Sequence, residues 1–410
     1  MKKRLVVIGN GMAGMRTVEE LLSIAPEKYE ISVFGAEAYG NYNRIMLSAV
    51  LSGEKVIEDI MINNRQWYEE NAITLYAGPD KTVVKIDRDA KQVHAQDGLS
   101  VSYDVLLIAT GSRPFILPIP GHQLAGVICF RDIIDVNTML SYSKTHKTAV
   151  VLGGGLLGLE AANGLALQGM AVTVLHDGEF LLNRQLDPQA ATLLRKALEQ
   201  RGIKFKMCAK TEALLGDDNA HVSAVKFVDG DVLDCDLFVM AIGIRPNMAL
   251  AQEAGLVCER GIVVNDGLQT SDPCIYSVGE CIQHRGNTFG LVAPLFDQAK
   301  VCADHLGATG QAEFIHLPTA TKLKVTGINV FSVGDFIGVE GTQIIHFSDA
   351  KAGVYKKLVI KDEQLVGAVL YGDTADSSWY QSLLENNQNI AGVRDSLIFG
   401  YTYATETEAA

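Results

Sequence analysis

The sequence predicts an α/β protein, with two similar parallel-sheet units followed by a small α+β domain. Three observations support this prediction. A strand, glycine loop, helix and strand occur in this order twice, both copies end in a similar strand, and short alternating strands begin near residue 321. The length of 410 residues is enough for two or three domains with buried cores.

The first copy of the pattern opens the chain. An apolar run at residues 5–8 predicts a buried strand, and the loop Gly-Asn-Gly-Met-Ala-Gly at residues 9–14 leads into apolar residues at helical spacing. A second strand is expected at residues 29–34. In a Rossmann-like dinucleotide-binding domain, such glycines allow a tight turn, close approach of a pyrophosphate and close packing of helix on strand. Glu37, just past the second strand, is the expected acceptor for ribose hydroxyls.

The second copy has expected strands at residues 149–152 and 171–175, with a glycine loop at residues 153–158 after the first of them. Two dinucleotide-binding domains in one chain suggest one bound flavin and one visiting nicotinamide nucleotide. The position of the ribose acid is taken here by His176, for which the alternative interpretation is an ordinary polar residue at a strand end.

The charges that follow His176 favour NAD over NADP. Asp177 and Glu179 should repel a 2′-phosphate, and the nearest basic residue, Arg184, lies eight residues beyond His176.

The domain boundaries follow from the two similar strand endings, Ala-Thr-Gly-Ser-Arg-Pro at residues 109–114 and Ala-Ile-Gly-Ile-Arg-Pro at residues 241–246. We expect an FAD-binding domain at residues 1–113 and 244–316, an NAD-binding domain at 114–243, a C-terminal α+β domain at 317–400 and a frayed tail at 401–410.

The composition excludes several classes of function. The 35 Lys and Arg residues against 48 Asp and Glu residues give a net charge of −13, which opposes binding to nucleic acid or to an anionic membrane. No run of apolar residues is long enough to span a membrane. The seven cysteines form no C-x-x-C pair, so neither a disulfide framework nor a metal site is expected. We therefore expect an acidic cytoplasmic enzyme.

Together these segments resemble the FAD- and NAD-dependent reductases of the pyridine nucleotide-disulfide oxidoreductase-like family, over most of the chain. Within that family, five segments are similar to the FAD-containing electron-transfer subunit of assimilatory nitrate reductases and to the N-terminal flavin part of NADH-dependent nitrite reductases. These segments are residues 41–44, 153–160, 241–247, 279–281 and 290–294.

The resemblance implies roles for particular residues. The residues implied to contact FAD are Gly9, Gly11, Met12, Ala13, Gly14, Glu37, Arg44, Ser48, Val83, Ala109, Thr110, Gly111, Arg131, Glu280 and Val292. The residues implied on the nicotinamide side are Gly153, Gly155, Leu156, Leu157, Gly158, His176, Arg184, Ile242 and Gly243.

Glu160, two residues past the third glycine of the second loop, is the implied catalytic residue near the flavin, with an exposed helix residue as the alternative. Several relatives pair this glutamate with a lysine, but this chain has Ala49 at the matching position. The protonation state of Glu160 is therefore an open question.

The pattern of cysteines bears on where electrons leave. Residues 41–48 contain no cysteine, which opposes the thiol chemistry of disulfide and peroxide reductases, and Cys274 and Cys281 are interpreted as buried thiols rather than a redox pair. We therefore expect an NADH-dependent FAD oxidoreductase that passes electrons to a redox protein, namely a molybdenum nitrate reductase or a nitrite reductase. The alternatives are a rubredoxin or ferredoxin reductase and a redox-sensing flavoprotein. Whether the chain is complete or the flavin part of a longer protein stays open.

Overall fold

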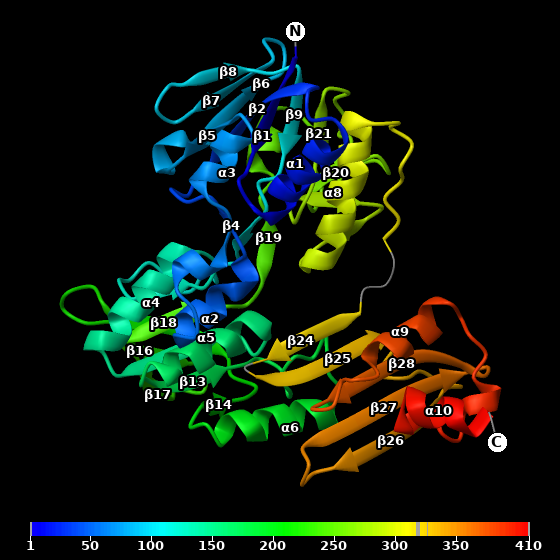
Figure 1. Cartoon of the computed structure of the whole chain (residues 1–410). Coiled ribbons are helices and arrows are strands. Elements are labelled where there is room, and N and C mark those ends of the chain that lie inside the picture. Colours follow the sequence, from blue (N-terminus) through cyan, green and yellow to red (C-terminus); the bar gives the residue numbers. More distant parts are fainter. Residues whose placement is uncertain (1, 317–319, 326, 409–410) are drawn as a thin grey trace.

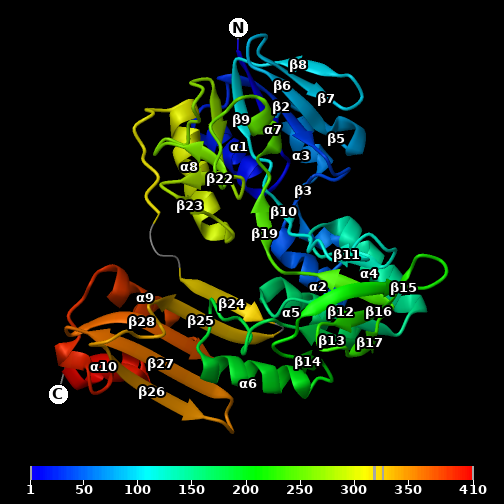
Figure 2. The ribbon, with the colours of Figure 1, turned by 180° about the vertical axis from the view of Figure 1, so that it is seen from behind.

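A computed structural model of the chain describes residues 2–316, 320–325 and 327–408. Three parts are visible, each with its own main sheet, and the C-terminal part lies beside the second part (Figures 1 and 2). The predicted fold class, two Rossmann-like units and a small C-terminal α+β unit, is confirmed. In the described ranges, no helix is both long and apolar enough to cross a membrane.

The first part contains a five-stranded parallel sheet of order β21-β9-β1-β2-β5. Its strands are β21 (Ile275–Ser277), β9 (Val105–Ile108), β1 (Lys3–Ile8), β2 (Tyr29–Gly35) and β5 (Ile73–Ala77). The helices of this part are α1 (Met12–Ile24), α3 (Arg65–Glu70), α7 (Ala249–Glu253) and α8 (Val292–Gly307). It also contains an antiparallel sheet of β6 (Val83–Asp87), β7 (Gln92–Ala95) and β8 (Ser100–Ser102). A further small sheet consists of β20 (Ile262–Val264), β22 (Ile282–His284) and β23 (Asn287–Thr288).

The second part repeats this architecture with a parallel sheet of order β11-β18-β12-β13-β14. Its strands are β11 (Val127–Cys129), β18 (Leu237–Met240), β12 (Thr148–Leu152), β13 (Ala171–Leu175) and β14 (Lys204–Lys206). Its helices are α4 (Ile133–Thr145), α5 (Leu156–Leu167) and α6 (Pro188–Glu199), and β15 (Thr211–Gly216), β16 (Val222–Phe227) and β17 (Val232–Asp234) form a second, antiparallel sheet. The chain enters and leaves this part through the antiparallel pair β10 (Ser112–Pro114) and β19 (Ile244–Pro246).

One segment of the first 113 residues packs against the second part, which differs from the domain assignment expected from the sequence. It lies between the paired strands β3 (Asn41–Tyr42) and β4 (Met61–Asn63) and contains α2 (Leu47–Ser52). Leu51 of α2 is fully buried, and its backbone oxygen accepts a hydrogen bond of 2.9 Å from the side chain of Gln168. Gly164 of α5 allows this contact, because a methyl group there would lie 2.6 Å from Cγ of Leu51.

The C-terminal part is an antiparallel sheet of order β24-β25-β28-β27-β26. Its strands are β24 (Thr321–Val325), β25 (Ile328–Gly334), β28 (Gln364–Tyr371), β27 (Val354–Lys361) and β26 (Gln343–Asp349). Helix α9 (Ser377–Glu385) shares a core with one face of this sheet, and Tyr380 is a packing residue of that core whose hydroxyl donates to the backbone oxygen of Leu397 over 2.8 Å. Side chains of the other face belong to the same core as α6.

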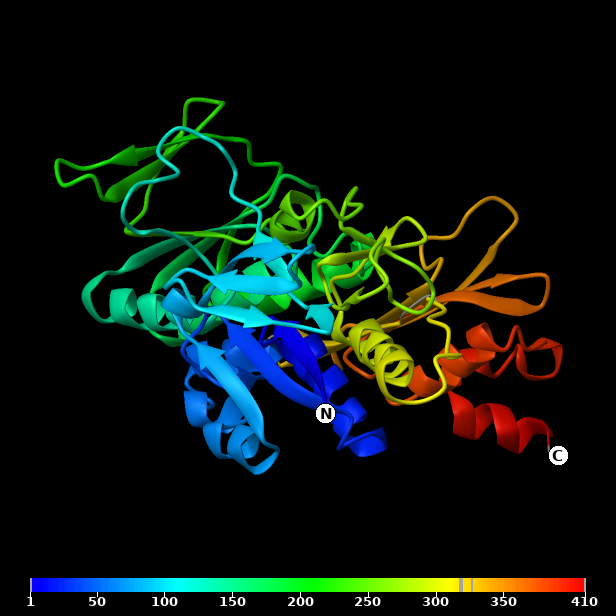
Figure 3. The same ribbon diagram turned by 90° about the horizontal axis from the view of Figure 1, so that it is seen from above.

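The expected frayed tail at residues 401–410 is wrong for residues 401–408, and residues 409–410 lie outside the described residues. Residues Tyr401–Glu408 form helix α10, which lies at the outer edge of the C-terminal part (Figure 3). The carboxylate of Asp376 accepts a hydrogen bond of 3.1 Å from the backbone N–H of Tyr401, and Ala404 is fully buried. These contacts hold a helix where the polar composition alone indicated none.

Candidate functional site

The two glycine loops begin with the same geometry. Gly9 follows β1 with φ 113°, and Gly153 follows β12 with φ 129°, a region that disfavours any residue with a side chain. A methyl group on Gly9 would clash with the carbonyl oxygen of Ala109, and one on Gly153 would clash with that of Ala241. Each loop is therefore pressed against the end of the neighbouring parallel strand.

The third glycine of each loop allows close packing, and the middle glycine borders open space. A methyl group on Gly14 would lie 2.9 Å from the carbonyl oxygen of Gly9, and one on Gly158 would clash with the carbonyl oxygen of Gly153, so both positions need glycine for close packing. A methyl group on Gly11 or Gly155 would meet no atom within 4 Å. The middle glycines thus face open space in which a pyrophosphate fits against the backbone.

The helices that follow the loops begin without a side-chain cap. Gly11 precedes α1, Gly155 precedes α5 and Leu291 precedes α8, and none of these residues caps its helix. By contrast, α4 and α6 are capped by the carboxylates of Asp132 and Asp187. The free N–H groups of an uncapped helix start bind negatively charged groups, so both loops fit a dinucleotide.

Most of the predicted site residues lie at the carboxyl ends of the two parallel sheets. Met12 and Ala13 form the first turn of α1, and Leu156 and Leu157 form that of α5. The segment of Ala109, Thr110 and Gly111 follows β9, and Ile242 and Gly243 follow β18. Ligands of open α/β sheets bind at this edge.

Glu37 lies in a polar cluster beside the first loop. Its carboxylate accepts a hydrogen bond of 2.7 Å from the hydroxyl of Tyr42 and forms an ion pair with Arg44. The guanidinium of Arg44 also donates to the backbone oxygen of Arg131 over 3.1 Å and lies 4.8 Å from the ring centre of Tyr42. The predicted ribose acceptor is therefore held in one position by an arginine and a tyrosine.

Glu280 lies in a similar cluster after β21. It accepts hydrogen bonds of 2.5 Å from the guanidinium of Arg131 and 2.7 Å from the hydroxyl of Ser112. Before it, Gly279 has φ 98°, and its N–H donates to the side-chain oxygen of Gln298 on α8 over 2.8 Å. Gln298 thereby holds the turn that presents Glu280.

Asp135 of α4 completes this region by accepting a hydrogen bond of 2.7 Å from the backbone N–H of Arg131. Burial and the neighbouring carboxylate of Asp132 raise the pKa of Asp135 to about 6.

Four of these positioning residues were not predicted from the sequence. Tyr42 lies within a segment that carried the family resemblance, and Ser112 lies within the repeated strand ending, so both had a signal in the sequence. Gln298 had none, because its partner Gly279 lies on another element and the two meet only in the folded chain. Asp135 contacts the backbone N–H of Arg131, four residues before it, and no motif in the sequence marked it.

Glu160 lies in α5, two residues past Gly158, and is partly buried. Burial raises the pKa of its carboxyl group to about 7, because the low-dielectric surroundings disfavour the charged form. Among the described residues no basic side chain forms an ion pair with Glu160. Helix α2, which carries Ala49 and Ser48, packs against α5, and the hydroxyl of Ser48 donates to the backbone oxygen of Ile45 over 3.3 Å.

His176 follows β13 and is built into the second loop. Its Nδ1 accepts a hydrogen bond of 3.3 Å from the N–H of Gly154, and its Nε2 lies 3.1 Å from the backbone oxygen of Phe180. Its ring is mostly buried, whereas Asp177, Glu179 and Arg184 are exposed on the segment that follows. His176 therefore organises the loop, and the charges that a nucleotide would meet are on its neighbours.

Two predicted residues lie on other elements. Val83 begins β6 and is buried in the core of the first part, and Val292 is the first residue of α8.

The cysteines are all free thiols. Cys281 and Cys302 are fully buried, and burial raises the pKa of each thiol. Within the residues that the structure covers, no group of His, Cys, Asp and Glu side chains is arranged to hold a metal ion.

Comparison with known proteins identifies the family of both main parts. The family model described as pyridine nucleotide-disulphide oxidoreductase matches residues 3–304, and the rubredoxin NAD+ reductase C-terminal domain matches residues 319–388. Members of the first family use FAD and NAD(P)H, so the predicted cofactors and the prediction of an FAD-dependent oxidoreductase are confirmed.

Two curated relatives come from Bacillus subtilis. Nitrite reductase [NAD(P)H] is 49% identical over 390 residues, covering 95% of this chain and 48% of the relative. The assimilatory nitrate reductase electron transfer subunit is 44% identical over 397 residues, covering 97% of this chain and 51% of the relative. The predicted resemblance is thus confirmed, and the chain spans about half the length of these relatives.

The fold also occurs in solved structures. A ferredoxin reductase from Rhodopseudomonas palustris has a TM-score of 0.87 at 23% identity, and the match covers 100% of both chains.

Proposed function

Since the chain belongs to the pyridine nucleotide-disulphide oxidoreductase family, we propose that it oxidises NADH and passes the electrons by way of FAD to the catalytic part of an assimilatory nitrate or nitrite reductase. The observation that carries this proposal is the pair of glycine loops. Both leave open space at the middle glycine and an uncapped helix start, yet they differ past the second strand, where Glu37 lies two residues beyond β2 and His176 lies directly after β13.

On this proposal the first loop holds FAD. Glu37, fixed by Tyr42 and Arg44, accepts from the ribose, and Glu280, fixed by Arg131 and Ser112, accepts from the ribityl chain. Arg44 and Arg131 supply positive charge near the pyrophosphate. FAD held by these residues would supply the chemistry of hydride transfer from NADH and of single-electron release to a protein acceptor.

The second loop then holds NADH. The N–H groups at the start of α5 meet the pyrophosphate, and Leu156 and Leu157 lie in the same first turn. On this proposal Glu160, whose carboxyl group has a pKa of about 7 and which follows this turn in α5, acts near the reacting rings. It tunes the electrostatics of the site without a basic partner among the described residues.

The properties of the cysteines support a protein, rather than a thiol of this chain, as the electron acceptor. The buried cysteines have raised pKa values, which opposes a role as nucleophile or redox pair. The two relatives from Bacillus subtilis are named for nitrite reduction and for electron transfer to nitrate reductase, and these names supply the acceptor class.

Stopped-flow mixing of the FAD-loaded chain with NADH tests the first half of the proposal. We expect NADH to remove the absorbance of the oxidised flavin within seconds or faster. Steady turnover should follow when an artificial acceptor is present. An FAD-loaded protein that NADH leaves oxidised would contradict the proposal. Reduction without turnover would instead favour a redox-sensing flavoprotein.

A rubredoxin or ferredoxin reductase is the second candidate. It is favoured by the match of residues 319–388 to the rubredoxin NAD+ reductase C-terminal domain. Values of kcat/KM with rubredoxin, with ferredoxin and with a nitrate or nitrite reductase catalytic subunit, measured over a range of acceptor concentrations, decide between the candidates. The proposed function requires the last acceptor to give the highest kcat/KM.

A further inference from the structure

A buried polar junction joins the C-terminal sheet to the second dinucleotide unit. The carboxylate of Asp187 accepts a hydrogen bond of 2.7 Å from the hydroxyl of Tyr355 and lies 3.6 Å from Nζ of Lys357. Asp187 is 4% exposed, Tyr355 2% and Lys357 9%. Lys357 also donates to the backbone oxygen of Ile337 over 3.2 Å. A buried carboxylate with these partners is costly to leave unpaired, so the junction fixes its members firmly.

Asp187 is the last residue of the segment 176–187, which connects β13 to α6. The other oxygen of its carboxylate caps α6 by accepting from the N–H of Ala190 over 3.0 Å. At its beginning the segment is tied to the glycine loop by His176, and in its middle the N–H of Leu182 donates to the backbone oxygen of Gly154 over 3.0 Å. The segment is thus held at one end by the second glycine loop and at the other by the C-terminal sheet.

This segment carries the exposed charges that a nucleotide at the second loop would meet, Asp177, Glu179 and Arg184. Arg184 lies only three residues before Asp187, so the junction fixes the chain close to Arg184.

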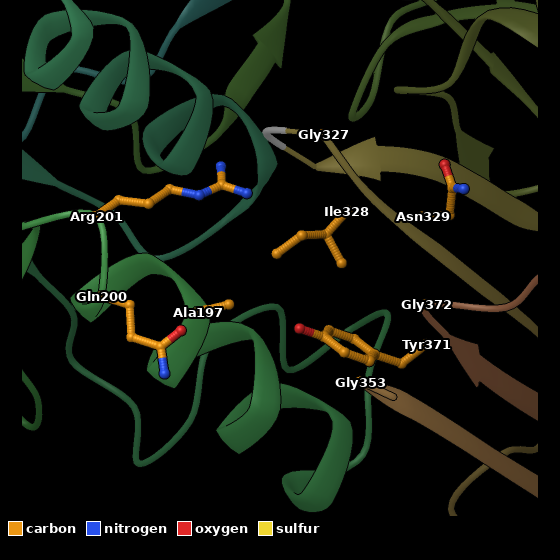
Figure 4. A pocket seen from close by; sticks show the side chains of 9 residues that line it. All are labelled: Ala197, Gln200, Arg201, Gly327, Ile328, Asn329, Gly353, Tyr371 and Gly372. Atoms are coloured by element: carbon orange, nitrogen blue, oxygen red, sulfur yellow. The ribbon is translucent and has the colours of Figure 1, made fainter. Parts of the chain in front are cut away.

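The interface between α6 and the C-terminal sheet contains a pocket at the end of the helix that lies away from Asp187. Between the last turn of α6 and the C-terminal sheet lies a pocket of about 380 Å³ (Figure 4). It is lined by Ala197, Gln200, Arg201, Gly327, Ile328, Asn329, Gly353, Tyr371 and Gly372. Packing is therefore incomplete at the end of α6, and the polar contact that fixes the segment lies at the start of the helix.

We propose that the Asp187–Tyr355–Lys357 junction makes the C-terminal sheet a positioning element of the nicotinamide nucleotide site. Tyr355 and Lys357 touch no nucleotide on this proposal; they act through Asp187 on the segment 176–187. The inference depends on the proposed function, because it assumes that the second loop binds NAD(H).

The strand β27 provides a matched control. Successive residues of a strand point to opposite faces, so Lys356 points away from the junction. Its Nζ pairs with Asp373 at 2.8 Å and with Asp376 at 3.5 Å, and it is 6% exposed. Lys356→Met therefore removes a buried, paired lysine from the same strand without touching the segment 176–187.

The test measures the Kd of NAD+ by calorimetry for the full-length, FAD-loaded chain. For Tyr355→Phe and Lys357→Met we expect the Kd to rise on the order of fivefold to tenfold, with unchanged FAD content. For Lys356→Met we expect a change of less than about twofold. Hydrogen exchange should speed up over residues 182–187 in the first two variants and stay unchanged there in Lys356→Met. Tyr355→Phe keeps the aromatic ring, so it decides the question if Lys357→Met does not fold.

Equal Kd values for wild type and Tyr355→Phe would overturn the inference and leave the proposed function intact. An equal loss of affinity in Lys356→Met would also overturn it, because the effect would then be general destabilisation of the C-terminal part. If wild type binds no NAD+ or NADH, the proposed function fails and the inference fails with it.

Discussion

The two dinucleotide units share their backbone and differ in the side chains around it. In both, the first and third glycines are pressed against backbone, the middle glycine faces open space and the next helix starts uncapped. Past the second strand the units differ: Glu37 lies two residues beyond β2, and His176 lies directly after β13. Two residues past the third glycine, Arg16 forms an ion pair of 2.5 Å with Glu20, whereas Glu160 has no such partner among the described residues.

This difference separates what a glycine loop specifies from what its surroundings specify. The loop geometry determines that a dinucleotide fits. The first unit adds two charged pairs, Glu37 with Arg44 and Glu280 with Arg131, and Arg44 also reaches the backbone oxygen of Arg131. The second unit adds hydrogen bonds of His176 to backbone groups and an anchor to another domain. Such an arrangement suits one tightly held and one exchanging nucleotide.

Substituting alanine for the middle glycine of each loop is the strongest test of the difference between the two units. Both glycines have φ values that alanine accepts, −93° at Gly11 and −85° at Gly155, and a methyl group meets no atom there. We expect Gly11→Ala to weaken FAD and Gly155→Ala to weaken NAD+ by about 1–3 kcal/mol each, because the methyl group occupies space next to the pyrophosphate. Calorimetric titration of each variant with each ligand measures both effects.

Gly158→Ala should affect the stability of the fold, whereas Gly155→Ala should affect ligand binding. The methyl group of Gly158→Ala would clash with the carbonyl oxygen of Gly153, so the free energy of unfolding should fall, whereas Gly11→Ala and Gly155→Ala should change it by less than about 0.5 kcal/mol. If Gly11→Ala weakened NAD+ as much as FAD, the assignment of one ligand to each loop would be wrong.

The parts of the molecule that were predictable from the sequence are those with a local pattern. Apolar runs and glycine loops predicted both parallel-sheet units, because strand, turn and helix start are set by neighbouring residues. The position of α2 against α5 was not predictable, since it depends on the contact of Leu51 with Gly164 across more than a hundred residues. The same holds for the hydrogen bond from Gly279 to Gln298 and for helix α10, whose start is fixed by Asp376.

The pH dependence of stability sharpens the contrast between Glu160 and Arg16. The folded-state pKa of Glu160 is raised to about 7 from an ordinary 4.5, so the folded chain holds the proton more tightly than the unfolded chain. The contribution of Glu160 to the free energy of unfolding is therefore fully present below pH 4.5 and is lost as the pH rises through about 7. Relative to Glu160→Gln, wild type should lose roughly 2–2.5 kcal/mol between pH 5 and 7.5.

Urea unfolding of wild type and Glu160→Gln at several pH values, in the same cofactor state, measures this difference. A difference between the two proteins that does not change with pH would show that a basic group or bound water compensates the carboxylate. Arg16→Gln serves as the control in the first unit: an arginine stays charged across this range, so the difference between this variant and wild type should change little from pH 5 to 7.5.

The smallest expected effect concerns the charges next to His176. Asp177→Asn combined with Glu179→Gln removes two exposed negative charges from the segment that replaces the acidic ribose residue. Exposed charges interact weakly with a ligand, so the Kd ratio of NADP+ to NAD+ should fall only about twofold to threefold, and less at high salt. Asp218→Asn, an exposed aspartate in the β15–β16 turn, is the control and should leave the ratio unchanged. If the double variant also leaves the ratio unchanged, nucleotide preference in the second unit depends on the shape of the segment 176–187 rather than on its charge.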